Sequence, residues 1–198
     1  MSNYLAIATV TTTLRDILDN AVSAIIPGAT VTTQRPEKVG NGTQSQAGVN
    51  LYLYQVTPNA AWRNSDIVIR RSSPQAPDNR GKDTIEQHTQ IPLNLHYLFS
   101  FYGDDQKLEP QRLLGRVVSA IEAKPILSLD SIRMAIQHNE ALKQSDLDFQ
   151  VENIERIKLA PLTLSLEDLS KLWSVFFQVP YALSVAYVFA KSVLLRPS

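Results

Sequence analysis

Residues 91–102, with the sequence IPLNLHYLFSFY, have the clearest alternation of apolar and polar side chains in the chain. Every odd-numbered position holds a large aliphatic or aromatic residue, whereas Asn94, His96 and Ser100 occupy even-numbered positions. Successive side chains of a strand point to opposite faces of a sheet, so this pattern predicts a strand with one buried face. The turn-forming sequence Gly103-Asp104-Asp105 ends it.

Outward from this segment, several others have the length and composition of strands. Residues 49–56 carry apolar bulk on both faces, which is typical of a strand covered on two sides. In residues 181–193, large residues alternate with Ala and Ser, and this small face would let a helix or another backbone come close. Shorter or less regular strands are predicted at residues 30–34, 67–70 and 149–159, and at the alternating residues Ile132, Met134 and Ile136.

Three segments have the apolar periodicity of amphipathic helices. Residues 4–26 carry a continuous apolar stripe, and Pro27-Gly28 ends it. A second helix begins at Pro110, which suits a first helical position. A third begins after Ser165, whose spacing from Asp168 matches a capping box. The residues expected to be buried by this third helix are Leu166, Leu169, Leu172, Trp173 and Phe176.

The order of these elements indicates the fold class. Helices and strands do not alternate strictly, so a doubly wound parallel sheet is not expected. We expect an α+β fold with a mixed, mainly antiparallel sheet packed by about three helices, formed as a single domain by residues 1–198. Residues 72–90 are polar and contain two prolines and a glycine, and we expect them to form a projecting or flexible loop.

Composition excludes several classes of protein. Nineteen basic residues balance nineteen acidic ones, so the basic excess typical of nucleic-acid-binding proteins is missing. The chain has no cysteine, which excludes thiol catalysis, thiolate metal sites and disulfides. The N-terminus lacks the basic region of a secretory signal. The apolar run at residues 181–195 is shorter than the roughly 20 residues that span a bilayer. We therefore expect a cytoplasmic protein without direct membrane insertion.

The sequence offers no catalytic constellation. His88, His96 and His138 are far apart, and neither a nucleophile elbow nor a paired-histidine metal motif is present. Glycines that would cradle a phosphate before a helix are also missing. We therefore expect no enzymatic activity, no metal and no cofactor. An unrelated small enzyme stays open as a rival class, and it would need a pocket with convergent perturbed groups.

Aromatic and basic residues are the candidates for binding. Tyr52 and Tyr54, with the nearby Trp62, would suit a contact between subunits, although both faces of their strand could equally be plain core. Guanidinium groups favour the carboxylates of a protein partner, and the alternative is a polar surface that serves solubility. The candidate interface residues are Tyr52, Tyr54, Asn59, Trp62, Arg63, Arg70, Arg71 and Arg80.

Three stretches together carry a family resemblance. They are residues 49–64 (VNLYLYQVTPNAAWRN), residues 92–98 (PLNLHYL) running into Tyr102-Gly103, and residues 164–174 (LSLEDLSKLWS) followed by the strand from residue 181. In this order and spacing, they resemble the tail-terminator, or cap, proteins of phage-tail-like contractile injection systems. The similarity is to the extracellular type, typified by the antifeeding prophage and the Photorhabdus virulence cassettes.

The resemblance implies a structural role. Such proteins are expected to form a ring, hexameric in the family, that ends growth of the inner tube and caps the sheath distal to the baseplate. The implied partners are further copies of the chain, the sheath protein and the inner tube protein, in a particle that is released or anchored. An open sheet edge supplied by residues 30–47 or by the final strand could receive a sheath strand. A monomeric assembly adaptor or chaperone of the same machine is the alternative.

Overall fold

The computed structural model describes residues 5–36, 47–59, 91–143, 158–176 and 179–195. The predicted strand at 67–70, most of the one at 149–159 and the expected loop at 72–90 lie outside these residues. The elements are, in chain order, α1 (Ala6–Ser23), β1 (Thr30–Thr32), β2 (Gly48–Pro58), β3 (Ile91–Tyr102), the 3₁₀ turn η2 (Asp105–Lys107), α2 (Glu109–Ala123), α3 (Leu129–His138), the 3₁₀ turn η3 (Glu140–Leu142), β4 (Lys158–Leu162), α5 (Leu166–Ser174) and β5 (Leu183–Leu195).

The strands form one five-stranded sheet in the order β1-β2-β3-β5-β4. Only β1 and β2 pair in parallel, and the other three pairings are antiparallel. The expected α+β class with a mixed, mainly antiparallel sheet is confirmed. The described part of the chain contains four α-helices, one more than expected.

The strand β3 is the middle of the sheet and has the predicted bounds. Its side chains at Leu95, Tyr97, Phe99 and Phe101 pack into the core formed with α1, α2 and α3, and the three aromatic ones are almost completely buried. Two of these rings meet rings of β5 edge to face, with centroids 5.4 Å apart for Tyr97 and Phe189 and 5.3 Å for Phe99 and Tyr187. Such pairs add about 1 kcal/mol beyond the area they bury.

A hydrogen bond fixes α1 to β3. The Thr11 hydroxyl donates to the Ile7 carbonyl at 3.0 Å, so at the 2.7 Å contact between Thr11 Oγ1 and Tyr97 Oη the tyrosine is the donor. Burial raises the pKa of Tyr97 well above its usual value. The phenol therefore keeps its proton and its partner, as a buried hydroxyl should.

The helix α3 corrects one prediction. The alternation of Ile132, Met134 and Ile136 predicted a strand, and this was wrong. The Ser128 side chain caps the helix by accepting the Ser131 N–H at 3.2 Å. Ile132, Ala135 and Ile136 are buried at helical spacing, whereas Met134 is 52% exposed. Residues four apart share a face in a helix as well as in a strand, so the two isoleucines fit either structure.

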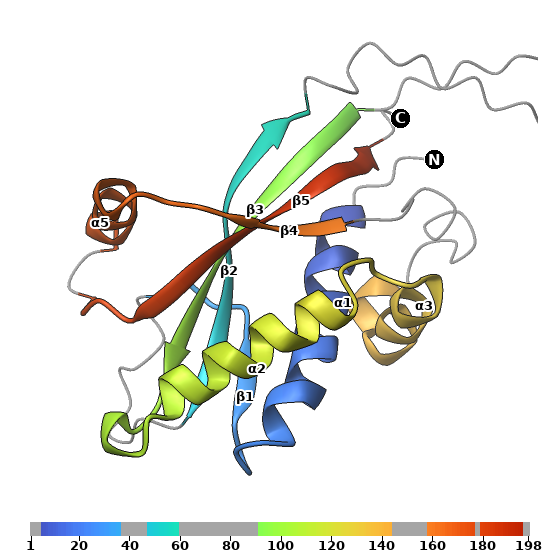
Figure 1. Cartoon of the computed structure of the whole chain (residues 1–198). Helices are drawn as coiled ribbons and strands as arrows, with labels where there is room; N and C mark the ends of the chain where they lie inside the picture. Colours follow the sequence, from blue (N-terminus) through green and yellow to red (C-terminus); the bar gives the residue numbers. More distant parts are fainter. Residues whose placement is uncertain (1–4, 37–46, 60–90, 144–157, 177–178, 196–198) are drawn as a thin grey trace, which may run out of the picture.

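The helix α5 lies on the face of the sheet opposite the other helices (Figure 1). Ser165 caps it as predicted, because Ser165 Oγ accepts the Asp168 N–H at 3.0 Å and donates to Asp168 Oδ2 at 2.7 Å. Trp173 and Phe176 are buried as expected, but Leu166 is 87% exposed, so its expected burial was wrong. The last two turns of α5 make the packing contacts, and Leu166 belongs to the first turn.

Outward N–H groups of both edge strands have partners. At β1, the Val31 N–H donates to Asp19 Oδ1 of α1 at 2.8 Å. At β4, the Leu159 N–H donates to the Pro125 carbonyl at 2.8 Å, and Pro161 has no N–H to offer. The final strand, β5, pairs with β3 on one side and, through residues 186–190, with β4 on the other, so it supplies no open edge over those residues. The other candidate segment includes the edge strand β1, and its residues 37–46 lie outside the described residues.

We predict that Asp19→Ala lowers the free energy of unfolding by about 1–2 kcal/mol and increases self-association. The substitution leaves the Val31 N–H without its acceptor and exposes the edge of β1. Urea unfolding and light scattering would measure the two effects. Asp19→Asn keeps an acceptor oxygen, and Asp16→Ala removes a partly exposed carboxylate of the same helix, so both serve as controls. Equal stability of Asp19→Ala and Asp19→Asn would contradict the assignment.

Candidate interaction surface

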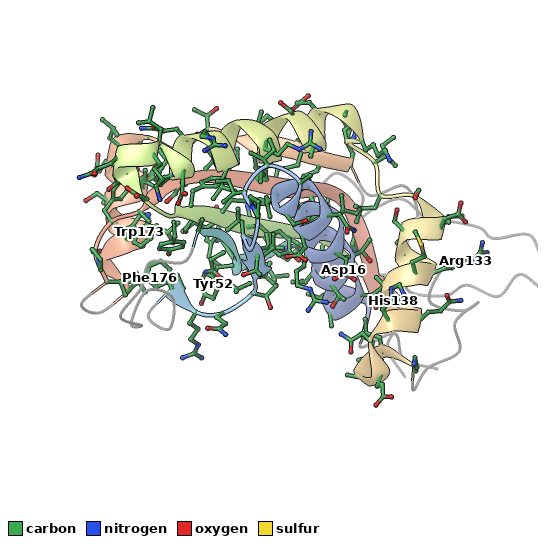
Figure 2. The ribbon with its side chains drawn as sticks, turned by 90° about the horizontal axis from the view of Figure 1, so that it is seen from below. Asp16, Tyr52, Arg133, His138, Trp173 and Phe176 are labelled. Atoms are coloured by element: carbon green, nitrogen blue, oxygen red, sulfur yellow. The ribbon has the colours of Figure 1, made fainter. Side chains whose placement is uncertain are left out.

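The helix α5 is held on the sheet by a cluster of aromatic rings. The Phe176 ring lies edge to face with Tyr52 of β2 and with Trp173, with centroids 5.6 Å apart in both pairs. These three side chains gather on one side of the sheet in Figure 2. Leu98 of β3, which is fully buried, forms the floor of the cluster. The short helix is therefore attached through its C-terminal half.

The small face of β5 allows this packing. Trp173 Nε1 donates to Ser184 Oγ at 3.2 Å, and Ser184 Oγ donates to the Ala182 carbonyl at 2.6 Å. The Tyr181 ring covers Trp173 from outside, with centroids 5.5 Å apart, and is itself 61% exposed. The indole thus has a polar partner for its N–H and apolar contacts around its body, which is the arrangement that buried tryptophans need.

An open groove runs beside α5, between this helix, the segment after β4 and the irregular part of β2. Its volume is about 540 Å³. The pairing of β2 with β3 shifts by one residue between Leu53 and Gln55, and this irregularity brings Tyr54 to the groove. Besides His96, the other lining side chains are four aliphatic ones, an amide, a cation and a carboxylate: Leu162, Leu164, Leu172, Val175, Gln55, Lys171 and Asp168.

The groove also includes His96. Its Nε2 lies 3.0 Å from Thr57 Oγ1, its ring centroid is 6.0 Å from that of Tyr54, and its buried Nδ1 has no hydrogen-bond partner among the described residues. Burial lowers the pKa of His96. A hydroxyl beside an imidazole resembles part of a nucleophilic site, but the group that would orient the imidazole through Nδ1 is missing from the described part of the chain. The described part of the chain also contains no cluster of His, Asp and Glu side chains that could hold a metal ion.

The structure brings only some of the predicted interface residues together. Tyr52 and Tyr54 are half-buried and lie against the α5 cluster and the groove. Asn59 is buried at the end of β2, where its Nδ2 donates to Asn94 Oδ1 at 2.9 Å, so it joins β2 to β3. The other predicted residues lie outside the described ranges: Trp62, Arg63, Arg70, Arg71 and Arg80.

Sequence reasoning missed the exposed apolar residues that flank α5. Leu166, Val175 and Tyr181 are 87%, 74% and 61% exposed. Leu166 and Val175 are nine residues apart and therefore lie on opposite sides of the helix. A helical projection of α5 places Val175 well away from Trp173 and would have identified this residue. Among the described residues, no helix is long and apolar enough to cross a bilayer.

We predict that Trp173→Ala destabilises the protein by about 3 kcal/mol, the usual cost of removing a buried aromatic ring. Leu166→Ala is the matched control on the same helix, and its effect should stay within about 0.5 kcal/mol because the side chain is exposed. Urea unfolding measures both. Equal losses in the two variants would show that α5 is not held as described.

We also predict a loss of stability in mild acid that depends on His96. Since burial lowers the pKa of His96, the unfolded chain binds a proton more readily, and stability is lost as the pH falls below about 6.5. Measurements of Tm between pH 7.5 and 5 should show this decline in the wild type and in His138→Gln. His96→Gln should flatten it. A decline that persists unchanged in His96→Gln would contradict the role of this side chain.

Comparison with known proteins gives the family. The family model of the Pvc16 N-terminal domain matches residues 9–196. Among solved structures, the chain is similar to the PVC sheath/tube terminator of an extracellular contractile injection system in the extended state. That match has 14% identity and a TM-score of 0.59 and covers 97% of this chain and 57% of that chain.

A second similar structure is the tube-terminating cap of the anti-feeding prophage. It has 12% identity and a TM-score of 0.49, and the match covers 92% of this chain and 54% of that chain. No curated protein matches. At such identities the first likeness shows a shared fold, and the chain spans little more than half the length of either solved relative. The resemblance to the tail-terminator proteins is confirmed. Because the family model covers nearly the whole sequence, this chain belongs to the Pvc16 N-terminal domain family.

Proposed function

We propose that this chain is a structural cap of a contractile injection system. In this proposal, copies of the chain form a ring, hexameric in number, on the end of the inner tube distal to the baseplate. The ring stops tube growth and caps the sheath. The observation that carries the proposal is the match of the family model to residues 9–196, supported by the shared fold with a protein described as a sheath/tube terminator.

The sheet edges fit a subunit that ends a polymer. A subunit in a growing tube must offer a surface for the next ring, whereas a terminal one must not. Within the described residues, Asp19 occupies the outward N–H of β1, and Pro161 removes a donor from β4. Closed edges of this kind suppress strand addition. They favour a chain that binds the tube end without offering a new site for strand pairing.

The proposed role is non-enzymatic. One solved relative is described as a sheath/tube terminator, and the imidazole in the groove beside α5 has no group to orient it at Nδ1 among the described residues. We propose no cofactor and no nucleic-acid partner. The proposed partners are other copies of this chain, the sheath protein and the inner tube protein, within a phage-tail-like particle assembled in the cytoplasm.

The predicted interface residues keep a place in this proposal. Tyr52 and Tyr54 lie at the α5 cluster and its groove, close to the exposed apolar residues. We propose that Trp62, Arg63, Arg70, Arg71 and Arg80 contact carboxylates of a protein partner, since guanidinium groups pair well with them. We also propose that residues 1–198 act as a single domain with a projecting loop at 72–90.

Tube length gives the test. The tube, sheath and baseplate proteins of the same particle would be co-expressed with and without this chain, and tube lengths would be measured by electron microscopy. We predict a narrow length distribution with the chain and overlong or variable tubes without it. Restoration by the wild-type chain added on a separate plasmid is the control.

Two results would contradict the proposal in different ways. Identical tube lengths with and without the chain would contradict a terminating role. Controlled length in purified particles that contain none of the chain would favour the alternative, a monomeric adaptor or chaperone that acts only during assembly. Quantitative mass spectrometry of the purified particles distinguishes these cases.

A further inference from the structure

The surroundings of His96 suit a neutral imidazole and not a charged one. The Nε2 atom lies 3.0 Å from Thr57 Oγ1, and Nδ1 is buried without a hydrogen-bond partner among the described residues. In the neutral tautomer with its proton on Nε2, the ring donates to Thr57, and Nδ1 carries no proton that needs an acceptor. In the imidazolium both nitrogens carry protons, so the one on Nδ1 is left without an acceptor, which costs free energy.

Among the described residues that line the groove, His96 is the only group that changes its charge in mild acid. Tyr54 of β2 stays neutral, because burial raises the pKa of its phenol. Asp168 of α5 stays ionised, because the hydrogen bond from the Ser165 hydroxyl lowers its pKa. Lys171 of α5 also lines the groove, and a lysine is positive throughout this range. The side chains that β5 and the segment around the end of β4 place near His96 are aliphatic: Val188, Leu162 and Leu164.

The contact between α5 and the sheet is small. The helix has nine residues, and the buried side chains that attach it are Trp173, near its end, and Phe176, just after it. In the described part of the chain, one side-chain hydrogen bond joins it to the sheet, from Trp173 Nε1 to Ser184 Oγ. An element held by few buried contacts opens locally at a lower free energy than the whole domain unfolds. The helix α5 is therefore the wall of the groove that opens while the strands stay paired.

We propose that His96 is a pH-sensitive switch whose protonation in mild acid loosens α5 from the sheet while the sheet stays folded. The proton on Nδ1 needs water or a carboxylate, but the groove wall offers aliphatic side chains and the like charge of Lys171. The carboxylate of Asp168 already accepts two hydrogen bonds from Ser165 and its own N–H cap geometry, so water enters between α5 and β3 instead.

The direction of the switch follows from the burial of the imidazole. Burial lowers the pKa of His96 while α5 is in place, and the ring regains its ordinary pKa when the groove opens. Protons therefore bind more readily to the open form, so α5 stays attached above about pH 6.5 and loosens as the pH falls below that value. This opening is a property of the chain itself and is independent of the proposed cap function.

Tryptophan fluorescence tests the switch, because Trp173 is one of only two tryptophans in the chain and Trp62 can be replaced. In a Trp62→Phe background, emission and far-UV circular dichroism would be recorded on the same samples between pH 7.5 and 5. We expect the emission maximum of Trp173 to shift to the red and its quenching by acrylamide to increase, before the circular dichroism signal is lost. Binding of the dye ANS should increase over the same range, because an open α5 uncovers Tyr52 and Leu98.

Histidine variants connect the opening to one side chain. His96→Gln removes the titrating ring and should abolish the red shift and the increase in quenching. His138→Gln, an exposed residue of α3, and His88→Gln, outside the described residues, should keep both changes. Proton NMR of the histidine rings needs no folded His96→Gln variant, because the other two variants assign the His96 signal by elimination. The midpoint of its titration should coincide with the midpoint of the emission shift.

Three outcomes would overturn the proposal. One is an emission maximum that stays constant down to pH 5, including a loss of intensity without a red shift, which shows quenching by a nearby imidazolium and no opening. Another is a red shift that persists in His96→Gln or does not follow the His96 titration. The third is a red shift that coincides with the loss of the circular dichroism signal, since the whole domain then unfolds together. In each case, the tube-length experiment still decides the cap function separately.

Discussion

The burial of β3 on both faces is the constraint on which the rest of the structure depends. One face is covered by α1, α2 and α3 through Tyr97, Phe99 and Phe101, and the other meets α5 through Leu98. A strand covered in this way needs neighbours on both sides, and β2 and β5 supply them. The hydrogen bond from Tyr97 to Thr11 then fixes the first helix over the middle of the sheet.

This arrangement leaves the edge strands and the exposed apolar side chains at the outer parts of the molecule. The edge strands are short, and side-chain or backbone acceptors occupy their outward N–H groups at Val31 and Leu159. Six of the nine exposed large apolar residues in the described part of the chain lie near α5 and α3, which are ten residues long or shorter and lie at opposite ends of the molecule. The sheet therefore separates two ends of the molecule that carry exposed apolar residues. Its edge strands offer few free N–H groups for pairing with a further strand.

The sequence predicts the sheet well because a buried strand face imposes a period of two, and residues 91–102 show it without interruption. The sequence prediction fails at α3 because Ile132 and Ile136 are four residues apart. Residues at this spacing share a face both in a strand and in a helix. It fails at Leu166 because the apolar stripe of a helix does not tell how far the sheet beneath it extends. The sequence shows that Tyr52 and Tyr54 add apolar bulk to the second face of their strand. It does not show that α5 covers that face.

Cryo-electron microscopy of the tube end in the assembled particle tests the cap assignment most directly. We expect one ring of this chain on the last ring of the tube. A tube end without this chain, or copies of it along the tube or at the baseplate instead, would contradict the assignment.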